Sequence, residues 1–311
     1  MAQEMRAIYA QTLIELAEKD KNVVILEADL MKASGTGSFK DKFPERAFDM
    51  GVAEANMVGV ACGLSAGGKI PFAASFGCFA TRRAYDQFFL SGNYARRNVK
   101  LVGTDPGISA AFNGGTHMPF EDAGIMRNIP GLVVFEPSDG VSLKELLQCS
   151  YKHNGCTYMR LHRKAVEDIY KDGEKFEFGK GKVLRDGKDL TIIAMGAIMV
   201  PNALKAAEML AGEGISAAVV DMHTIKPIDA ELVIKYAEQT GAILAAENHQ
   251  VINGLGSAVA EVLSENLPTP MKRVGIYDEF GEVGTQDELM ARFHLAAADI
   301  ADEAKKLLKK R

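Results

Sequence analysis

The 311-residue sequence predicts an α/β protein of two domains, each a mostly parallel sheet flanked by helices. Three observations support this fold class. The chain is longer than a typical single domain, short apolar runs alternate with longer segments of helical periodicity, and 30 glycines supply the tight turns between them. With 47% hydrophobic and 25% charged residues, the composition is that of an ordinary globular protein.

The first domain is predicted over residues 1–166. Residues 5–19 have apolar positions at helical spacing, and the apolar run at 22–29 is typical of a buried parallel strand. By the same criteria, strands are expected at 46–50, 70–74, 98–103, 132–135 and 156–161, helices at 53–65, 81–90 and 140–151, and loops at 32–37, 75–79 and 104–117.

Residues 167–188 are charged and have little periodicity, which predicts the connection between the two domains. The alternation of strands and helices restarts in residues 189–311, the second predicted domain. Its strands are expected at 189–194, 216–221 and 242–247, and its helices at 200–213, 229–239 and 256–265. Such alternation predicts parallel strands covered by helices.

The charge pattern excludes some partners. Net charge is −5, the pI is about 5.8, and charges of both signs are interspersed, so we expect no nucleic-acid or membrane partner. No apolar run reaches the roughly 20 residues of a membrane span, and the N-terminus lacks a secretory-signal pattern. We therefore expect a cytoplasmic enzyme. The four cysteines lack metal-binding spacing, so we expect buried thiols and no metal site in this chain.

Three side chains near predicted strand ends could form a pocket, because ligands of open α/β sheets bind beyond the carboxyl ends of strands. Glu54 precedes a nearly charge-free helix. It either complements the helix dipole or faces a partly buried space, where it could share a proton with a ring nitrogen. Phe76 and Phe79 are either core aromatics or the walls of a pocket for a flat heteroaromatic ring.

His117 ends a glycine-rich loop, and Arg160 and Arg163 lie at the end of the strand expected at 156–161. The histidine is either solvated or part of a ligand-fitted loop. The arginines either bind a phosphate or carboxylate or have a simple surface role. The sequence contains no GxGxxG or GxxxxGK[ST] motif, and no GDG segment followed by an asparagine. A diphosphate–magnesium site of this kind needs a GDG segment with a downstream asparagine. We therefore expect this chain to supply only one half of the complete pocket.

Together these segments resemble the C-terminal half of the transketolase family, its pyrimidine-binding domain followed by its C-terminal domain. Residues 48–54 resemble the segment with the family's activating glutamate, here Glu54, which contacts the aminopyrimidine nitrogen of thiamine diphosphate. Residues 75–79 resemble the segment whose two aromatics pack around the pyrimidine ring. The resemblance implies cofactor contacts from Asp29, Glu54, Phe76 and Phe79, with Mg²⁺ bound mainly by a partner chain.

The resemblance also implies substrate contacts. Residues 114–117 are similar to the family's Gly-Pro-Thr-His, whose histidine contacts substrate hydroxyls, here His117. Arg163 and Arg6 fall where the family has phosphate-binding arginines, and Ser34 lies within about one residue of the corresponding serine.

At two further substrate positions the chain departs from the family pattern. Many transketolases have histidine in place of Asp105 and aspartate in place of Asn113. Since that aspartate helps to select the configuration of the donor's hydroxyls, the substrate preference is left open. The cofactor contacts are less affected by these departures.

The resemblance implies the C-terminal subunit of a split transketolase of the pentose phosphate pathway, with Glu54 and His117 as catalytic residues. Such an enzyme transfers a two-carbon ketol unit from a ketose phosphate to an aldose phosphate. A separate N-terminal subunit would carry the diphosphate and magnesium site, in a two-plus-two heterotetramer. Three alternatives stay open: a 1-deoxyxylulose-5-phosphate synthase-like half-chain, a 2-oxo acid dehydrogenase beta subunit, and a catalytically silent assembly subunit.

Overall fold

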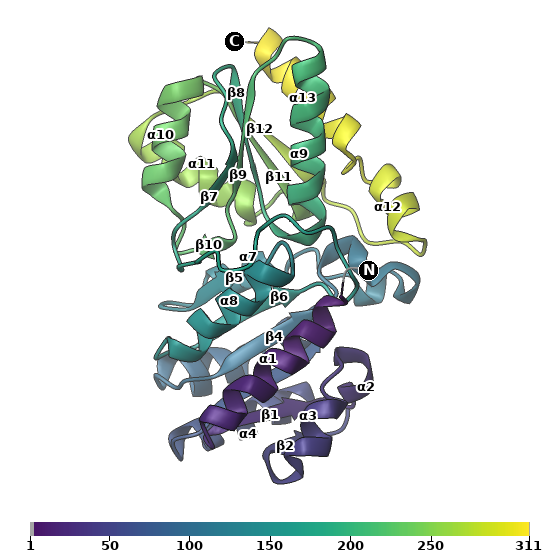
Figure 1. The fold of residues 1–311 in the computed structure, drawn as a ribbon, viewed down its shortest axis with the longest axis vertical. Coiled ribbons are helices and arrows are strands. Elements are labelled where there is room, and N and C mark those ends of the chain that lie inside the picture. Colours follow the sequence, from purple (N-terminus) through teal and green to yellow (C-terminus); the bar gives the residue numbers. More distant parts are fainter. Residues whose placement is uncertain (1–2, 311) are drawn as a thin grey trace.

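The computed structural model describes residues 3–310, which form two α/β units, one stacked on the other (Figure 1). A seven-stranded sheet has the order β10-β5-β6-β4-β3-β1-β2, and a five-stranded sheet has the order β12-β11-β8-β9-β7. All pairings are parallel except β10 with β5 and β7 with β9. The predicted fold class, two mostly parallel sheets flanked by helices, is therefore confirmed.

The seven-stranded sheet is built almost wholly from the first half of the chain. Its strands are β1 (Val23–Glu27), β2 (Ala47–Asp49), β3 (Ile70–Phe76), β4 (Lys100–Thr104), β5 (Val133–Phe135), β6 (Thr157–Leu161) and β10 (Thr224–Lys226). Every residue of β1, β4 and β6 is buried, as expected for central parallel strands covered on both faces.

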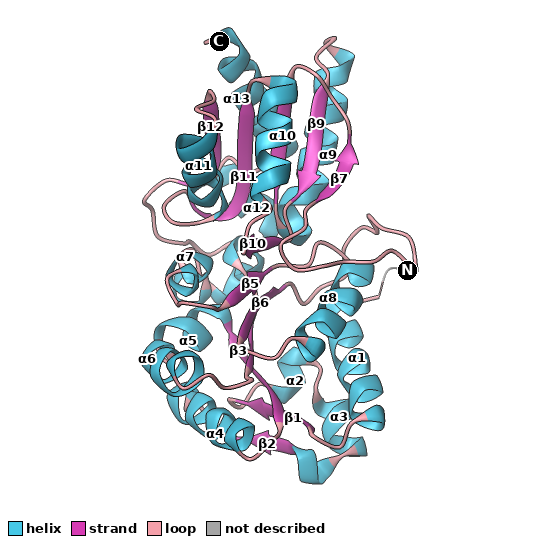
Figure 2. Ribbon diagram, turned by 90° about the vertical axis from the view of Figure 1, so that its left-hand side faces the viewer, coloured by secondary structure: helices cyan, strands magenta, loops and turns pink. Residues whose placement is uncertain are grey.

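Helices cover both faces of this sheet (Figure 2). On one face, α1 (Met5–Lys19) and α8 (Gly140–Lys152) pack into a common core. The opposite core contains α4 (Glu54–Ala66) and α7 (Asp122–Arg127). The remaining pieces are short: α2 (Met31–Ser34), α3 (Gly37–Lys42), α5 (Gly77–Arg82), α6 (Tyr85–Gln87), a π-helix (Phe88–Tyr94), and 3-10 turns at Pro44–Arg46, Gly107–Asn113 and Gly115–His117.

The five-stranded sheet belongs to the second half. Its strands are β7 (Lys182–Arg185), β8 (Leu190–Ala194), β9 (Ala217–Asp221), β11 (Ile243–Gln250) and β12 (Met271–Ile276). Its helices are α9 (Gly196–Gly212), α10 (Ala230–Thr240), α11 (Leu255–Asn266), α12 (Gln286–Arg292) and α13 (Ala297–Lys309). Side chains of α9 and α13 form one core of this sheet, and those of α10 and α11 pack on its other face.

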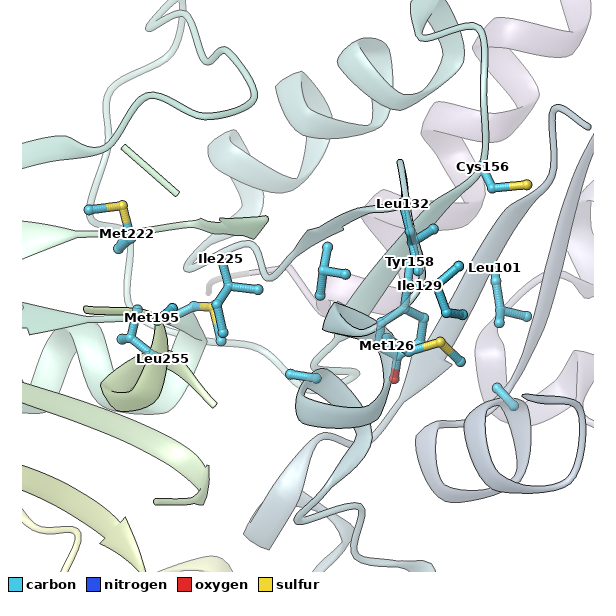
Figure 3. Close-up of a cluster of buried hydrophobic side chains, with 14 of the residues drawn as sticks. Leu101, Met126, Ile129, Leu132, Cys156, Tyr158, Met195, Met222, Ile225 and Leu255 are labelled. Carbon is cyan, nitrogen blue, oxygen red and sulfur yellow. The ribbon is translucent and has the colours of Figure 1, made fainter. Parts of the chain in front are cut away.

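One buried cluster joins the two sheets (Figure 3). Leu132 and Tyr158, from the first half, belong to the same cluster as Met195, Ile225 and Leu255 from the second. Ile225 lies in β10, which crosses over to extend the first sheet. This shared core and the crossing strand fix the second half against the end of the first sheet.

Most long elements lie where the sequence predicts them, but three short segments differ. The expected loop at 32–37 contains the end of α2 and the start of α3, separated by Gly35 at φ 80°. The expected loop at 75–79 is the end of β3 followed directly by α5. The expected helix at 81–90 is broken into α5, α6 and the π-helix. Such one- and two-turn helices are too short for a periodic pattern to reveal.

The predicted connection, residues 167–188, contains the edge strand β7, which pairs antiparallel with β9. The domain boundaries at 166 and 189 stay a prediction. Over residues 3–310 no helix is long and apolar enough to cross a membrane.

Candidate functional site

The carboxyl ends of neighbouring parallel strands place several of the predicted residues on one edge of the first sheet. Phe76 is the last residue of β3, Asp105 directly follows β4, and Arg163 follows β6 by two residues. Asp105 keeps the edge compact, since its backbone N–H donates to the Leu161 carbonyl at 3.0 Å. This is where an open parallel sheet binds its ligands.

Glu54 is the first residue of α4, and its side chain is 4% exposed. Nη1 of Arg83 lies 3.3 Å from each carboxylate oxygen, and the Ser75 hydroxyl lies 3.5 Å from Oε1. The carboxylate therefore faces the end of β3 and the residue that follows α5, rather than only lying near the dipole of its own helix. Arg83 was not among the residues predicted for the site.

Two phenyl rings and an imidazole lie edge to face beside this carboxylate. The ring centroids of Phe76 and Phe79 are 6.0 Å apart, and the His117 ring lies 5.2 Å from the first and 5.0 Å from the second. The Arg83 guanidinium stacks 4.0 Å from the Phe79 ring centroid. A single guanidinium thus links Glu54 to the aromatic group, and the predicted pocket residues are neighbours in space.

The loop geometry orients His117. The residue ends the 3-10 turn Gly115–His117, and its Nδ1 lies 2.9 Å from the Thr116 hydroxyl. Arg82 donates to the Thr116 carbonyl at 3.3 Å, which ties the turn to α5. The imidazole is half-buried, so it remains accessible to a bound molecule.

A cleft of about 300 Å³ adjoins the aromatic group. Arg163 connects the two, because its guanidinium lies 5.1 Å from the Phe76 ring centroid and its Nε 2.6 Å from Oδ2 of Asp105. Burial raises the pKa of Asp105, and the charge of Arg163 opposes that rise. Four predicted substrate residues line the cleft: Arg6, Asp105, Asn113 and Arg163.

Backbone pairing brings Arg6 into this cleft. The N–H of Arg6 donates to the Arg163 carbonyl at 3.1 Å, and that of Met5 donates to the Lys164 carbonyl at 3.3 Å. Both arginine side chains then donate to the Ala33 carbonyl, at 3.2 Å from Arg6 and 3.3 Å from Arg163. Lys164 also lines the cleft and was not predicted. Its neighbour Arg163 was the only signal for it in the sequence.

Two predicted residues lie apart from this group. Ser34 is 2% exposed, and its hydroxyl donates to Oε1 of buried Glu27 at 2.6 Å instead of facing the cleft. Asp29 is exposed at φ 60°, and its N–H donates to Asp49 at 2.9 Å. Their roles as substrate and cofactor ligands stay predictions. Among residues 3–310, no three His, Cys, Asp or Glu side chains are grouped closely enough to bind a metal ion.

Comparison with known proteins matches both halves of the chain to one family. Residues 1–168 match the family described as "Transketolase, pyrimidine binding domain", and residues 179–300 match "Transketolase, C-terminal domain". The chain is 52% identical to the 6-deoxy-6-sulfo-D-fructose transketolase subunit of Clostridium sp. (strain MSTE9), over 96% of this chain and 93% of that protein.

Two further relatives span nearly the same length. A protein of Methanocaldococcus jannaschii, named as a transketolase C-terminal section, is 45% identical over 98% of this chain and 96% of its own. A solved structure, described as a split-gene transketolase in an inactive β4 tetramer, superposes with a TM-score of 0.91 at 43% identity, covering 99% of both chains. The chain therefore belongs to the transketolase family and corresponds to the family's C-terminal half.

Proposed function

We propose that this chain is the C-terminal subunit of a thiamine diphosphate-dependent transketolase. The observation that carries the proposal is the buried Glu54 carboxylate, held at a strand-end edge beside two aromatic rings. A flat aminopyrimidine needs such a set: apolar faces for the ring and a carboxyl group for a ring nitrogen. Glu54, Phe76 and Phe79 fit this requirement.

When bound, the cofactor supplies a carbon nucleophile and an electron sink for cleavage of a carbon–carbon bond. The role of Glu54 is to hold a proton at the pyrimidine nitrogen, which selects the tautomer needed for activation. In this structure Arg83 is the ion-pair partner of Glu54. When the pyrimidine ring nitrogen binds to Glu54, the half-exposed guanidinium must therefore share the carboxylate or move away from it. His117, in contact with both phenyl rings, orients substrate hydroxyls or transfers a proton to them.

The cationic cleft is proposed to bind the charged end of the sugar. Arg6 and Arg163 converge on one carbonyl, so a single anion in front of them would meet both guanidinium groups. Asn113 and Asp105 also line the cleft and would contact the hydroxyls between the anion and the reacting carbon. The expected reaction is transfer of a two-carbon ketol unit from a ketose phosphate to an aldose phosphate.

A second substrate class is favoured by the charges of the cleft. Arg163 is already paired with Asp105 and Arg6 with Glu4, so two carboxylates offset part of the positive charge. A singly charged sulfonate requires less compensation than a phosphate monoester, which carries about −1.5 to −2 charges at neutral pH. The relative from Clostridium is named for a sulfonated ketose. A ketose with a terminal sulfonate is therefore the second candidate donor.

The other half of the site is proposed to come from a separate N-terminal subunit that binds the diphosphate and Mg²⁺. The motif for that site is missing from the sequence. The Clostridium relative is named a subunit, and the split-gene structure is a tetramer of one chain type described as inactive. These descriptions support an active two-plus-two assembly of both chain types.

The test is reconstitution. The purified chain is assayed with thiamine diphosphate and Mg²⁺, alone and with the separately expressed N-terminal subunit. The donor is xylulose 5-phosphate, 6-deoxy-6-sulfofructose or pyruvate, and the acceptor is an aldose phosphate. We expect ketol transfer only with both chains present, from a ketose donor. Full activity of the single chain would contradict the split site. Turnover of pyruvate alone would favour a synthase or dehydrogenase, and no turnover of any donor a silent subunit.

A further inference from the structure

A buried asparagine of the second half reaches across to the loop that carries His117. Asn248 lies near the end of β11 and is 2% exposed. Its Nδ2 donates to the Pro106 carbonyl at 2.8 Å, and its Oδ1 accepts from the Ile108 N–H at 2.9 Å. One amide group thus uses a donor and an acceptor on the two sides of the same backbone turn.

The turn is shaped to receive this side chain. Gly107, between the two bonded residues, has φ +54°, a conformation that favours glycine. A Cβ atom at this position would lie 2.0 Å from Oδ1 of Asn248. Backbone and amide are therefore packed without space for any side chain at 107.

The same loop is held by the second half at its far end. A Cβ atom on Gly115 would lie 2.1 Å from the Gly281 carbonyl oxygen, so these two backbones touch. Asp105 directly precedes the first anchor, and His117 follows the second by two residues. Between the anchors Phe112 is 71% exposed. The two anchors therefore determine where the exposed loop begins and where His117 leaves it.

Asn248 is itself fixed relative to the first sheet. Nη2 of Arg160, a fully buried residue of β6, donates to the Asn248 carbonyl at 3.0 Å. The same guanidinium is paired with Asp122 and Glu136. The hydrogen bond from Arg160 therefore ties Asn248 to β6, the strand that Arg163 follows.

We propose that Asn248 is a positioning residue for substrate: through the turn at 106–108 it sets the placement of Asp105 and His117. This inference rests on the proposed function, because the expected effect is a change in the binding and turnover of the ketose donor. Neither of the two hydrogen bonds touches the cofactor pocket formed by Glu54, Phe76 and Phe79.

Asn248→Asp is the sharpest variant, because it has nearly the same shape. A carboxylate can still accept from the Ile108 N–H, but it places an oxygen against the Pro106 carbonyl where the amide donates. Asn266→Asp is the matched control, since Asn266 also donates from Nδ2 to a backbone carbonyl, that of Val262 at 2.9 Å, and lies in α11.

The first measurement is a double-mutant cycle in the reconstituted complex. We expect Asn248→Asp to lower kcat/KM for the ketose donor about tenfold, the scale of one well-made hydrogen bond, without weakening thiamine diphosphate binding. In a background that carries both His117→Ala and Asp105→Ala the same change should cost less than about twofold, because its effect passes through these two residues. Equal losses in both backgrounds would mean that Asn248 acts only on general stability, and would overturn the proposal. Asn266→Asp should leave the activity unchanged.

The second measurement does not depend on activity. The chain contains no tryptophan, so Phe112→Trp gives a single tryptophan, excited separately from the tyrosines, in the exposed loop. In the full chain, Asn248→Asp should lower the fluorescence anisotropy of this reporter, and Asn266→Asp should not. Unchanged anisotropy would overturn the proposal even if the complex is active, whereas an inactive wild-type complex would contradict only the proposed function. If Asn248→Asp does not fold, Asn248→Ser removes the same paired contact without adding a charge.

Discussion

At the scale of single residues, the buried Glu27 carries a proton-dependent part of the stability. It ends β1 with a side chain that is 0% exposed, and Oε1 accepts from the hydroxyls of Ser34 at 2.6 Å and Thr36 at 2.7 Å. Burial raises its pKa to about 7, with a smaller rise from the charge of Asp49, against the two hydroxyl hydrogen bonds. The other oxygen, Oε2, has no hydrogen-bond partner among the residues described.

This raised pKa fixes the sign of a pH effect. The folded chain holds a proton on Glu27 that the unfolded chain releases between the ordinary value of 4.5 and about 7, so stability is lost as pH rises through that window. Glu27→Gln cannot ionise and should escape this loss. We expect the variant to gain about 1–3 kcal/mol relative to wild type at about pH 8, and almost nothing at about pH 4.5.

Urea unfolding of the chain at the two pH values measures this difference. Glu45→Gln is the control, because the Glu45 side chain is 69% exposed. The difference in the free energy of unfolding between this variant and the wild type should be the same at both pH values. A stability difference between Glu27→Gln and wild type that is the same at both pH values would contradict the assignment.

Some site residues were within reach of the sequence, and others were not. Glu54, Phe76, Phe79 and His117 stand in short motifs whose order resembles a family, and the structure brings them together. Arg83 was not predicted as a site residue, because its contact with Glu54 depends on the direction of α5 after β3.

At the scale of elements, helix α8 depends on a side chain that also ties down the connection between the two halves. Asp139 caps the helix by accepting from the Ser142 N–H at 2.8 Å. Its second oxygen accepts from the N–H groups of Ile169 at 2.9 Å and Tyr170 at 2.8 Å. One buried carboxylate therefore satisfies three backbone donors, of which only one belongs to the helix.

Asp139→Ala should accordingly cost more than the loss of an ordinary cap. We expect it to lower the free energy of unfolding by about 2–4 kcal/mol, from one lost cap and two buried N–H groups left unpaired. Thr285→Ala is the comparison, because Thr285 caps α12 alone and should cost about 1 kcal/mol. Urea denaturation of both variants gives the two values. Equal costs would show that the contacts to residues 169 and 170 contribute nothing.

Most long elements were predictable because their periodicity extends over many residues, although no element was predicted after residue 265, so β12 and α13 were missed. Strand β10 and helix α5 were not, since each is short and takes its conformation from distant partners. Thr224 in β10 pairs with Phe135 of β5, far away in the sequence. A local pattern contains no information about such a pairing.

At the scale of the whole molecule, a buried ionic centre joins the two halves. Arg160 of β6 is fully buried and pairs with Asp122 and Glu136 of the first half, while donating to the Asn248 carbonyl of the second. Burial raises the pKa of Glu136 to about 7, although the charge of Arg160 opposes the rise. The apolar cluster of Figure 3 also contains residues of both halves. From the sequence, Arg160 was expected either to bind an anion or to lie at the surface. Its role as a buried structural ion-pair partner was missed.

The central claim is that this chain gives a site, completed by a partner, its activating carboxylate. The direct measurement is the ketol-transfer rate of the reconstituted complex with Glu54→Gln, beside Glu45→Gln as the control. We expect Glu54→Gln to lower the rate at least about 100-fold, the scale of losing a positioned acid–base group, while the complex assembles and unfolds like the wild type. The control should keep full activity. A Glu54→Gln complex within twofold of the wild-type rate would contradict the claim.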